Sequence, residues 1–360
     1  MATNYNGKLN SNEILAIYNM IISQQVFADN MDGDAFNLVD QARVDGSLYG
    51  DTKLYYSTDV LSSHEWGNDA EAANLLAIAR PKAPSCQAVT LDKFRQIDLT
   101  LDNYLSKRAF STEGAFSSFN SVMLGWISYT KKIYDNTTYK AFIGTVESNV
   151  GKQEQVIDIT TATTGLTGEE KARVEAGLIG EAVAKLLVSL QNENRDYNDY
   201  GYMRTYGPGK LKFVWNADAV AKIQARDLPT IYHKEIIDKF NEYSLPGEYF
   251  GKINDTQKTG DGIICSLIEQ VVSKSGSADV HIFAGELIPT GYTAPAGTSY
   301  TPDSTILFKV FGKLPPYMSA FEVGTSFFNA KSLTENHYLT WGHNTLVKLD
   351  NYPCITVRSK

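Results

Sequence analysis

The sequence predicts a mixed α+β fold, and two observations carry this prediction. Apolar residues recur at spacings of three, four and seven from Gly114 to about Lys140, which is the period of a long amphipathic helix. The end of the chain, from Thr305 to Lys360, contains four runs rich in aromatic and β-branched residues, which is the composition of strands. Helices and strands are interleaved without strict alternation, which is typical of the α+β class.

The stretch from Phe94 to Thr145 is the segment around which the other parts are arranged. From Ile97 onward apolar residues alternate with polar ones, which predicts a half-buried strand before the long helix. We expect this helix to bury Phe116, Phe119, Met123, Trp126, Ile127 and Ile133. A strand and a helix this long and apolar favour a scaffold that carries the other elements.

Length and charge limit the possible functions. With 360 residues the chain can bury a large core and is expected to divide into two or more subdomains. Its net charge of -8 is uneven, since residues 1 to 80 carry -7 and residues 304 to 360 carry +3. A protein this acidic is a poor candidate for direct binding of duplex DNA. The charges form either a solvated surface or an acidic N-terminal surface that meets the basic C-terminal surface of a neighbouring copy.

Export and membrane signals are missing from the sequence. No basic segment precedes an apolar one, and no run of eighteen apolar residues occurs, so we expect neither a secretory signal nor a membrane span. Cys86, Cys265 and Cys354 are far apart in the sequence, which fits reduced or buried thiols in a cytosolic setting.

An amphipathic helix is predicted near the N-terminus, after the capping residues Ser11 and Asn12. The large apolar side chains on one of its faces are Ile14, Ile17, Tyr18, Ile21 and Ile22. This face either packs in the core of its own domain or forms an arm that packs on another subunit. From Asp29 to Asp69 the chain lacks the apolar mass for its own core, so we expect this part to leave the body and dock elsewhere.

A second long helix is predicted in the middle of the chain, where Thr167 and Glu170 fit a capping box. We expect it to bury Val174, Leu178, Ile179, Val183, Leu186, Leu187 and Leu190. One or two strands are predicted between residues 143 and 163, another in the run KLKFVW at 210 to 215, and a further one from Asp279 to Leu287. A helix is predicted from Asp261 to about Val272.

The sequence contains no set of residues that points to catalysis. None of the five histidines has the spacing of a metal-binding motif, and Cys86 lacks the surroundings of a nucleophile and is expected to be a buried, inert thiol. The run Gly207 to Lys210 is not a phosphate loop, because Arg204 occupies the first glycine position and Leu211 replaces the hydroxyl residue. We therefore expect no catalytic residues, no cofactor and no metal ion.

The order of these elements resembles that of the major capsid proteins of tailed bacteriophages, whose Hong Kong 97-type shell fold also occurs in encapsulins. FRQIDLTLDNYLSKRAF (94–110) and the following helix are similar to the family's strand and spine helix. KLKFVWNADAVAKI (210–223) resembles its strand leading into a helix, and PGEYFGKIND (246–255) resembles its short segment before the sheet continues. TENHYLTWGHNTLVKLDNYPCITVRSK (334–360) is similar to its closing strands.

This resemblance implies a division of the chain into four parts. Residues 1–45 would form an N-terminal arm and residues 46–100 an extended loop. Residues 101–166 and 315–360 would form a peripheral subdomain that contains the spine helix at about 114–140, and residues 167–314 an axial subdomain. Because the arm helix stands at the start of the sequence, we expect no cleavable N-terminal scaffolding segment.

The resemblance also implies a function without chemistry. The chain would assemble with itself into hexamers and pentamers of an icosahedral shell, which encloses double-stranded DNA without sequence-specific binding. Its place would be the virion capsid, assembled in the host bacterial cytoplasm without a membrane, and scaffolding, portal and decoration proteins would be further partners. Some shells of this class join subunits through a lysine–asparagine isopeptide bond, for which Lys82 is a candidate, although a plain surface lysine is the simpler interpretation.

Three other interpretations remain open. Within the same fold, the chain could form an encapsulin-like compartment that holds a cargo enzyme. It could be another virion part, such as a tail or portal-associated protein. From a different class, it could be a soluble enzyme with an unrecognised site.

Overall fold

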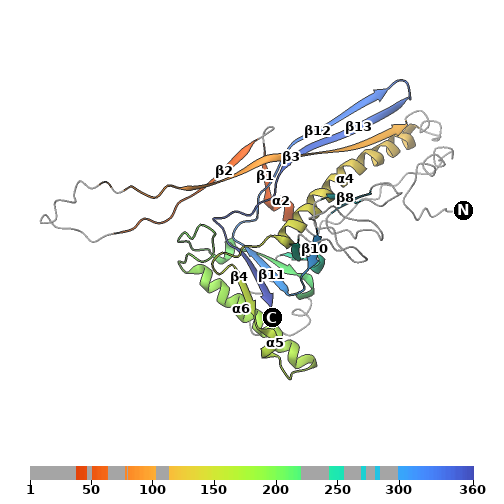
Figure 1. The fold of residues 1–360 in the computed structure, drawn as a ribbon. Helices are drawn as coiled ribbons and strands as arrows, with labels where there is room; N and C mark the ends of the chain where they lie inside the picture. Colours follow the sequence, from red (N-terminus) through yellow and green to blue (C-terminus); the bar gives the residue numbers. More distant parts are fainter. Residues whose placement is uncertain are drawn as a thin grey trace.

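A computed structural model describes residues 38–46, 51–63, 78, 80–102, 113–219, 243–254, 269–272, 280–283 and 299–360. Figure 1 shows an elongated molecule built around two sheets, with the long helix α4 (Glu113–Thr145) beside them. Two projections leave the body in opposite directions. One is an arm formed by β2 (Thr52–Ser57) and β3 (Ser85–Asp102), and the other is a tip formed by β12 (Tyr317–Asn329) and β13 (Thr334–Asn344).

The first sheet has the strand order β1 (Arg43–Asp45), β12, β13, β3, β2. β13 runs antiparallel to β3 from the pair Thr334↔Asp102 to the pair Asn344↔Leu91, and the earlier part of β3 pairs with β2. The strand expected from Ile97 onward is confirmed, but it begins earlier than expected. One strand therefore belongs to both the sheet and the arm, so it fixes the arm to the body through its own backbone.

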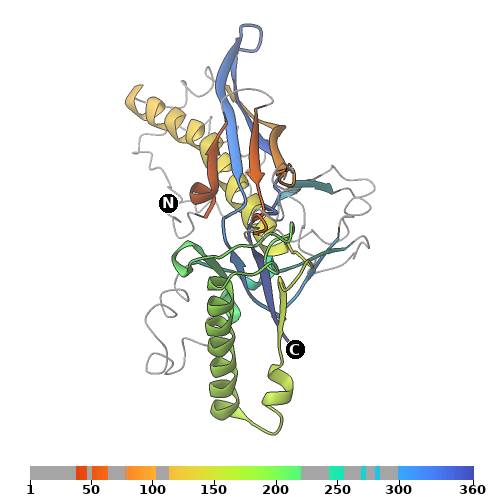
Figure 2. The same ribbon diagram turned by 90° about the vertical axis from the view of Figure 1, so that its left-hand side faces the viewer.

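The second sheet has the order β4, β14, β11, β5, β6. Its strands are β4 (Glu154–Ile157), β14 (Cys354–Ser359), β11 (Ile306–Phe311), β5 (Lys212–Asn216) and β6 (Tyr243–Leu245). On one face lie α6 (Gly168–Gln191) and the short α5 (Ile159–Ala162), as Figure 2 shows. The end of α4 and the short α2 (Leu38–Ala42) pack on the other face. The central strands are accordingly buried on both faces, and Phe213 and Trp215 pack with α6 while Val214 packs with Ile143 of α4.

The remaining described elements are short. They are η2 (Pro208–Lys210), η4 (Gly247–Tyr249), the pair β7 (Gly251–Asn254) with β10 (Ser299–Pro302), and the pair β8 (Glu269–Val272) with β9 (Val280–Phe283). The strand expected near residues 279 to 287 is therefore present as β9. The helix expected from Asp261 to about Val272 is wrong at its end, because residues 269 to 272 form a strand that pairs with β9. Residues 261 to 268 lie outside the described residues.

The expected core of the spine helix is confirmed in part. Met123 and Ile127 are buried, Phe119 and Ile133 are half-buried, and the side chain of Phe116 lies outside the described set. The prediction that Trp126 is buried is wrong, because 47% of its surface is exposed in the single chain. It lies about 100° around the helix from Ile127, beyond the stripe that faces the sheet.

The second long helix, α6, also differs in detail from the prediction. Ile179, Val183, Leu186, Leu187 and Leu190 are buried as expected, but Val174 and Leu178 are only half-buried. In this first part of the helix the buried positions are Ala172 and Ala176, and Figure 2 shows that it extends past the sheet toward α5. The capping-box prediction is wrong, since Thr167 stands at the cap without a side-chain hydrogen bond.

The sheets also correct the expected boundary between the subdomains. The expected peripheral part, residues 315–360, contains β14, but this strand pairs antiparallel with β11 and parallel with β4 in the second sheet. Five of its six residues are buried, which is the pattern of a central strand. The expected boundaries at 166 and 315 therefore divide this sheet. They place β4 and β14 in the peripheral part and β11 in the axial part, although β14 pairs with both β4 and β11.

A buried lysine joins the second sheet to the end of α4. Lys309 of β11 is fully buried, and its Nζ donates hydrogen bonds to the carbonyl oxygens of Gly144 at 2.8 Å and Val146 at 2.7 Å. The last carbonyls of a helix have no partner within the helix, and a cation there also interacts favourably with the helix dipole. Burial lowers the pKa of Lys309 to about 8. The neutral amine still has two hydrogens for the same two carbonyls.

We predict that Lys309→Met lowers the free energy of unfolding by about 2–4 kcal/mol, because each buried carbonyl left without a donor costs roughly 1–3 kcal/mol. The unfolded lysine has a pKa near 10.5. Between pH 8 and 10.5 the unfolded chain therefore holds this proton more tightly, so the wild type gains stability relative to the variant as the pH rises. Urea unfolding at several pH values measures both effects.

Lys185→Met is the matched control. Lys185 is exposed on α6, and its ion-pair partner is Glu181, which lies one helical turn earlier. It should change stability by less than about 0.5 kcal/mol. A Lys309→Met chain as stable as this control would contradict the role of Lys309.

A buried ion cluster holds α4 against the first sheet. The Asp135 carboxylate lies 3.1 Å from Lys131 Nζ and 3.8 Å from an Arg43 nitrogen of β1, and it accepts a hydrogen bond from the Tyr317 hydroxyl of β12. The side chains of Lys131 and Asp135 are less than one-tenth exposed. Burial, followed by the Asp135 charge, raises the pKa of Tyr317 well above its usual value, so the phenol keeps the proton that it donates.

A separate hydrogen-bond chain beside this cluster links Tyr134 of α4 to β13 and β3. Arg95 Nε donates to the Tyr134 hydroxyl at 3.1 Å, which lies 3.0 Å from His343 Nε2. His343 Nδ1 lies 3.0 Å from the Asn344 carbonyl, which only accepts, so Nδ1 carries the hydrogen and Nε2 accepts from Tyr134. Burial lowers the pKa of His343 and favours this neutral form. The neutral histidine thus links the helix to the sheet.

We predict that Asp135→Asn lowers the free energy of unfolding by about 3–5 kcal/mol, because removal of one partner of a buried ion pair leaves the other charge without compensation. The second change Lys131→Met should recover part of this loss, since it removes the buried charge. Chemical denaturation of the single and double variants measures the coupling. A loss below about 1 kcal/mol would show that the pair behaves as an exposed one.

Candidate interaction surfaces

The inner face of the arm packs against the body. Successive residues of a strand point to opposite faces, so each strand of the arm contributes alternate residues to this contact. The side chains that pack here are Tyr55, Val89, Leu91, Phe94, Met318 and Ala320. Burial raises the pKa of the Tyr55 phenol, which is consistent with its place at the edge of this cluster. The arm is therefore fixed along its inner face.

The outer face of the arm is apolar and exposed. Leu54 and Tyr56 are 52% and 65% exposed, and their partners across the ladder, Ala88 and Cys86, are exposed as well. We call these four residues the arm face. Val60, Leu61 and Ile78 extend the exposed apolar surface beyond the paired strands. Placing these side chains in water is unfavourable, so this surface is suited to contact with another protein.

The tip presents a second apolar surface. Phe327 and Phe328 of β12 are 62% and 52% exposed, and Val323 and Leu333 are exposed nearby. We call these four residues the tip patch. Neighbouring residues of a strand point to opposite faces, so the two phenylalanines expose apolar surface on both faces of the hairpin. Figure 1 places this patch and the arm at opposite ends of the molecule.

The outer edge of β12 is mostly without a strand partner in the described part of the chain. β1 pairs with it only from Tyr317 to Ser319. Beyond Ala320 the described strands pair with β12 on its β13 side alone. An exposed edge offers backbone donors and acceptors to another chain. The tip therefore combines apolar side chains with available backbone groups.

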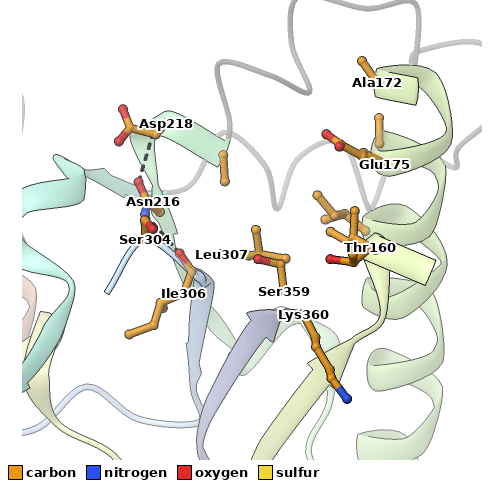
Figure 3. Close-up of a pocket in the computed structure, with 14 residues that line it drawn as sticks. Thr160, Ala172, Glu175, Asn216, Asp218, Ser304, Ile306, Leu307, Ser359 and Lys360 are labelled. Carbon is orange, nitrogen blue, oxygen red and sulfur yellow. Dashed lines mark hydrogen bonds between the residues drawn. The ribbon is translucent and has the colours of Figure 1, made fainter. Parts of the chain in front are cut away.

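A pocket of about 240 Å³ lies between α5, α6 and the strands β5, β11 and β14 (Figure 3). Its charged side chains are Glu175, Asp218 and Lys360, and no histidine or cysteine is among the described residues that line it. These residues therefore do not form a nucleophile paired with an imidazole base.

No group of three or more metal-ligating side chains occurs in the described ranges. None of the described helices is both long and apolar enough to cross a bilayer.

The described thiols differ from each other. Cys354 is buried, and burial raises its pKa to about 11, as for an inert core thiol. The prediction that Cys86 is buried is wrong, because Cys86 is exposed on the arm face. Alternation explains this position, since Cys86 follows Ser85 at the start of β3 and points away from the body. Cys265 lies outside the described residues.

The structure describes only some of the residues expected to mediate contacts. The expected N-terminal arm helix, with Ile14, Ile17, Tyr18, Ile21 and Ile22, lies outside the described residues. Lys82 is exposed, and its Nζ lies 6.0 Å from the ring centroid of Tyr202 in the same chain. This contact agrees with a surface lysine that packs on an aromatic ring.

Sequence reasoning missed both the arm face and the tip patch, although both left a signal. Leu54 and Tyr56 alternate with Lys53 and Tyr55, so burial of one set leaves the other exposed. The adjacent Phe327 and Phe328 cannot both face one core from a regular strand.

Comparison with known proteins gives a likeness of structure alone. No family model matches the chain, and no curated protein does. Among solved structures, a chain in the capsid structure of Staphylococcus phage Andhra is similar with a TM-score of 0.65 and 12% identity, covering 94% of this chain and 87% of that one. A chain in the structure of the head fiber and inner core protein gp22 of native bacteriophage P68 is similar with a TM-score of 0.58 and 10% identity, over the same shares. The chain therefore has the fold of a phage capsid protein.

Proposed function

We propose that this chain is a major capsid protein, which assembles with itself into hexamers and pentamers of an icosahedral shell around double-stranded DNA. The observation that carries the proposal is the structural likeness to a chain of the Andhra phage capsid along 94% of the sequence. The two exposed apolar surfaces at opposite ends of the subunit support it independently.

The position of these surfaces favours rings and shells over simple dimers. A contact between two different surfaces of identical subunits is heterologous, and it closes into a ring when the rotation between neighbours fits. The arm face of one copy would contact a neighbour, and the tip patch would contact another. Each contact would be modest, and repetition around the shell would make the assembly stable.

The remaining parts of the proposal follow from the resemblance of the sequence. Residues 1–45 would act as an arm in which Ile14, Ile17 and Ile21 contact a neighbouring subunit. The shell would form in the host bacterial cytoplasm and enclose DNA without sequence-specific contacts. Its work would be association, without catalysis. An encapsulin-like compartment is the alternative within this fold, and the contents of the particle distinguish the two.

The direct test is electron microscopy of the expressed protein in negative stain. We expect closed shells with hexameric and pentameric units, and nuclease-protected DNA inside particles from infected cells. Shells filled with protein would favour the compartment. A chain that elutes only as a monomer at every concentration, with no particles, would contradict the proposal and favour a soluble enzyme.

We predict that the double change Leu54→Glu and Tyr56→Glu lowers the yield of assembled particles at least tenfold while the subunit keeps its fold. Both side chains are more than half exposed, so charge there costs the subunit little but must be desolvated at an interface. Sedimentation measures assembly and circular dichroism measures folding. Val188→Glu, at an exposed apolar position of α6, is the control and should assemble normally. Normal assembly of the double variant would exclude the arm face from the contacts.

A further inference from the structure

The strands of the arm stop pairing before the arm ends. β2 and β3 are paired from Thr52↔Thr90 to Ser57↔Ser85, and the chains continue outward beyond this point without forming strands. Pro81 and Pro84 lie in the chain that returns to β3, and they have no backbone N–H for a ladder. We call residues 58–63 and 80–84 the outer arm. Its direction is not fixed by the sheet.

A loop that follows α6 contacts the arm at the point where the pairing of β2 and β3 ends. This loop consists of residues 194–204, and we call it the clamp loop. The Asp59 carboxylate accepts hydrogen bonds from Arg195 Nη1 at 2.6 Å and from the Met203 backbone N–H at 3.0 Å. Arg204 Nη2 donates to the Thr58 carbonyl. One chain of the outer arm is thus held by side-chain and backbone groups together.

The same loop also holds the second chain of the arm. The Tyr202 hydroxyl lies 2.6 Å from Oγ of Ser85, the first residue of β3, which pairs with Ser57 at the outer end of the ladder. The ring of Tyr202 has Arg204 Cζ at 5.7 Å and Lys82 Nζ at 6.0 Å from its centroid, which is the range of cation–π contacts. Tyr202 therefore contacts the second chain of the arm through its hydroxyl and its ring, and Arg204, which donates to Thr58 of the first chain, lies beside the same ring.

Internal hydrogen bonds make the clamp loop rigid. The buried Asn198 side chain donates to the Tyr202 carbonyl at 2.7 Å and accepts from the Tyr202 N–H at 2.8 Å. Asn194 and Arg204 exchange two backbone hydrogen bonds that close the loop. Gly201 has a φ of +65°, and its carbonyl accepts from Arg195 Nη1 at 2.8 Å. The guanidinium of Arg195 is therefore oriented by the loop as well as by Asp59.

The clamp loop is in turn fixed to the body of the subunit. The Asp199 carboxylate accepts hydrogen bonds from Ser148 Oγ and Gln153 Nε2, both at 2.7 Å, and it pairs with Lys348. Gln153 is fully buried beside β14, where its side-chain oxygen accepts from the Cys354 N–H at 3.0 Å. Contacts thus lead without a break from Asp59 through the loop to the second sheet.

The charges of the clamp persist over a wide pH range. The hydrogen bonds from Arg195 and the Met203 N–H lower the pKa of Asp59 to about 2. Exposed ion pairs contribute little to the stability of a whole fold. Such a set of contacts is therefore better suited to fixing a direction than to holding the subunit folded.

We infer that Arg195, Tyr202 and Arg204 are positioning residues, which set the direction in which the outer arm leaves the subunit. This inference rests on the proposed function, because the direction matters only where the arm meets a second copy. Without the clamp, the outer arm, with its exposed Val60 and Leu61, would reach its neighbour over a range of angles. Fixing the arm before contact lowers the conformational entropy lost on association.

The test compares Asp59→Asn, Arg195→Met and their combination with Glu181→Gln, which removes an exposed ion pair on α6 away from the arm. Tyr202→Phe removes only the hydroxyl that contacts Ser85. In the unassembled subunit, we expect the amides of residues 52–63 to exchange hydrogen at least fivefold faster in the clamp variants, with residues 212–216 unchanged. The yield of particles should fall at least tenfold. The double variant should be no worse than the single ones, because the two side chains act as one contact.

Two results would overturn the inference. One is unchanged exchange in the arm of the Asp59→Asn and Arg195→Met subunits. The other is faster exchange together with a wild-type yield of particles, which would make the clamp a local contact without a positioning role. If the wild-type chain forms no particles, the proposed function fails, while the exchange comparison in the subunit still decides whether the clamp fixes the arm.

Discussion

The contact between Lys309 and the end of α4 is the constraint on which the arrangement of the subunit depends. The two sheets share no strand among the described residues, and α4 packs against both. At its C-terminal end, Lys309 satisfies two carbonyls inside the core. Farther along the helix, Asp135 and Tyr134 contact the first sheet. These polar contacts have strict geometry, so they fix the register of the helix more sharply than apolar packing alone does.

Sequence periodicity predicted the long elements of the fold because they bury continuous stripes. The long helix, the second helix and the four closing strands were all expected, and β3, α4, α6 and β11 to β14 are present. Periodicity failed where a distant partner decides the environment. Trp126 matches the helical pattern but lies beside the covered stripe, and β14 reads like any other strand although it belongs to the second sheet. Pairing between residues far apart in sequence leaves no local signal.

The interaction surfaces were harder to predict than the core for a related reason. An exposed apolar residue has the same letter as a buried one, and only the fold shows which face the body covers. Leu54 and Val89 illustrate this, since both are apolar residues of the arm, yet one is exposed and the other is 2% exposed. The contact of the clamp loop with the arm could not be predicted for the same reason. Asp59 and Arg195 are far apart in the sequence, and nothing in their residue types marks them as partners.

The arm face and the tip patch also govern how the free subunit behaves before it meets a partner. Exposed apolar surfaces on every copy promote indiscriminate aggregation as soon as the concentration rises. The net charge of -8 opposes this, because like-charged copies repel each other at the distances where short-range apolar contact has not yet begun. Salt weakens that repulsion while leaving apolar attraction in place. If the chain associates as proposed, ionic strength is the solution condition expected to shift the balance between separate subunits and association.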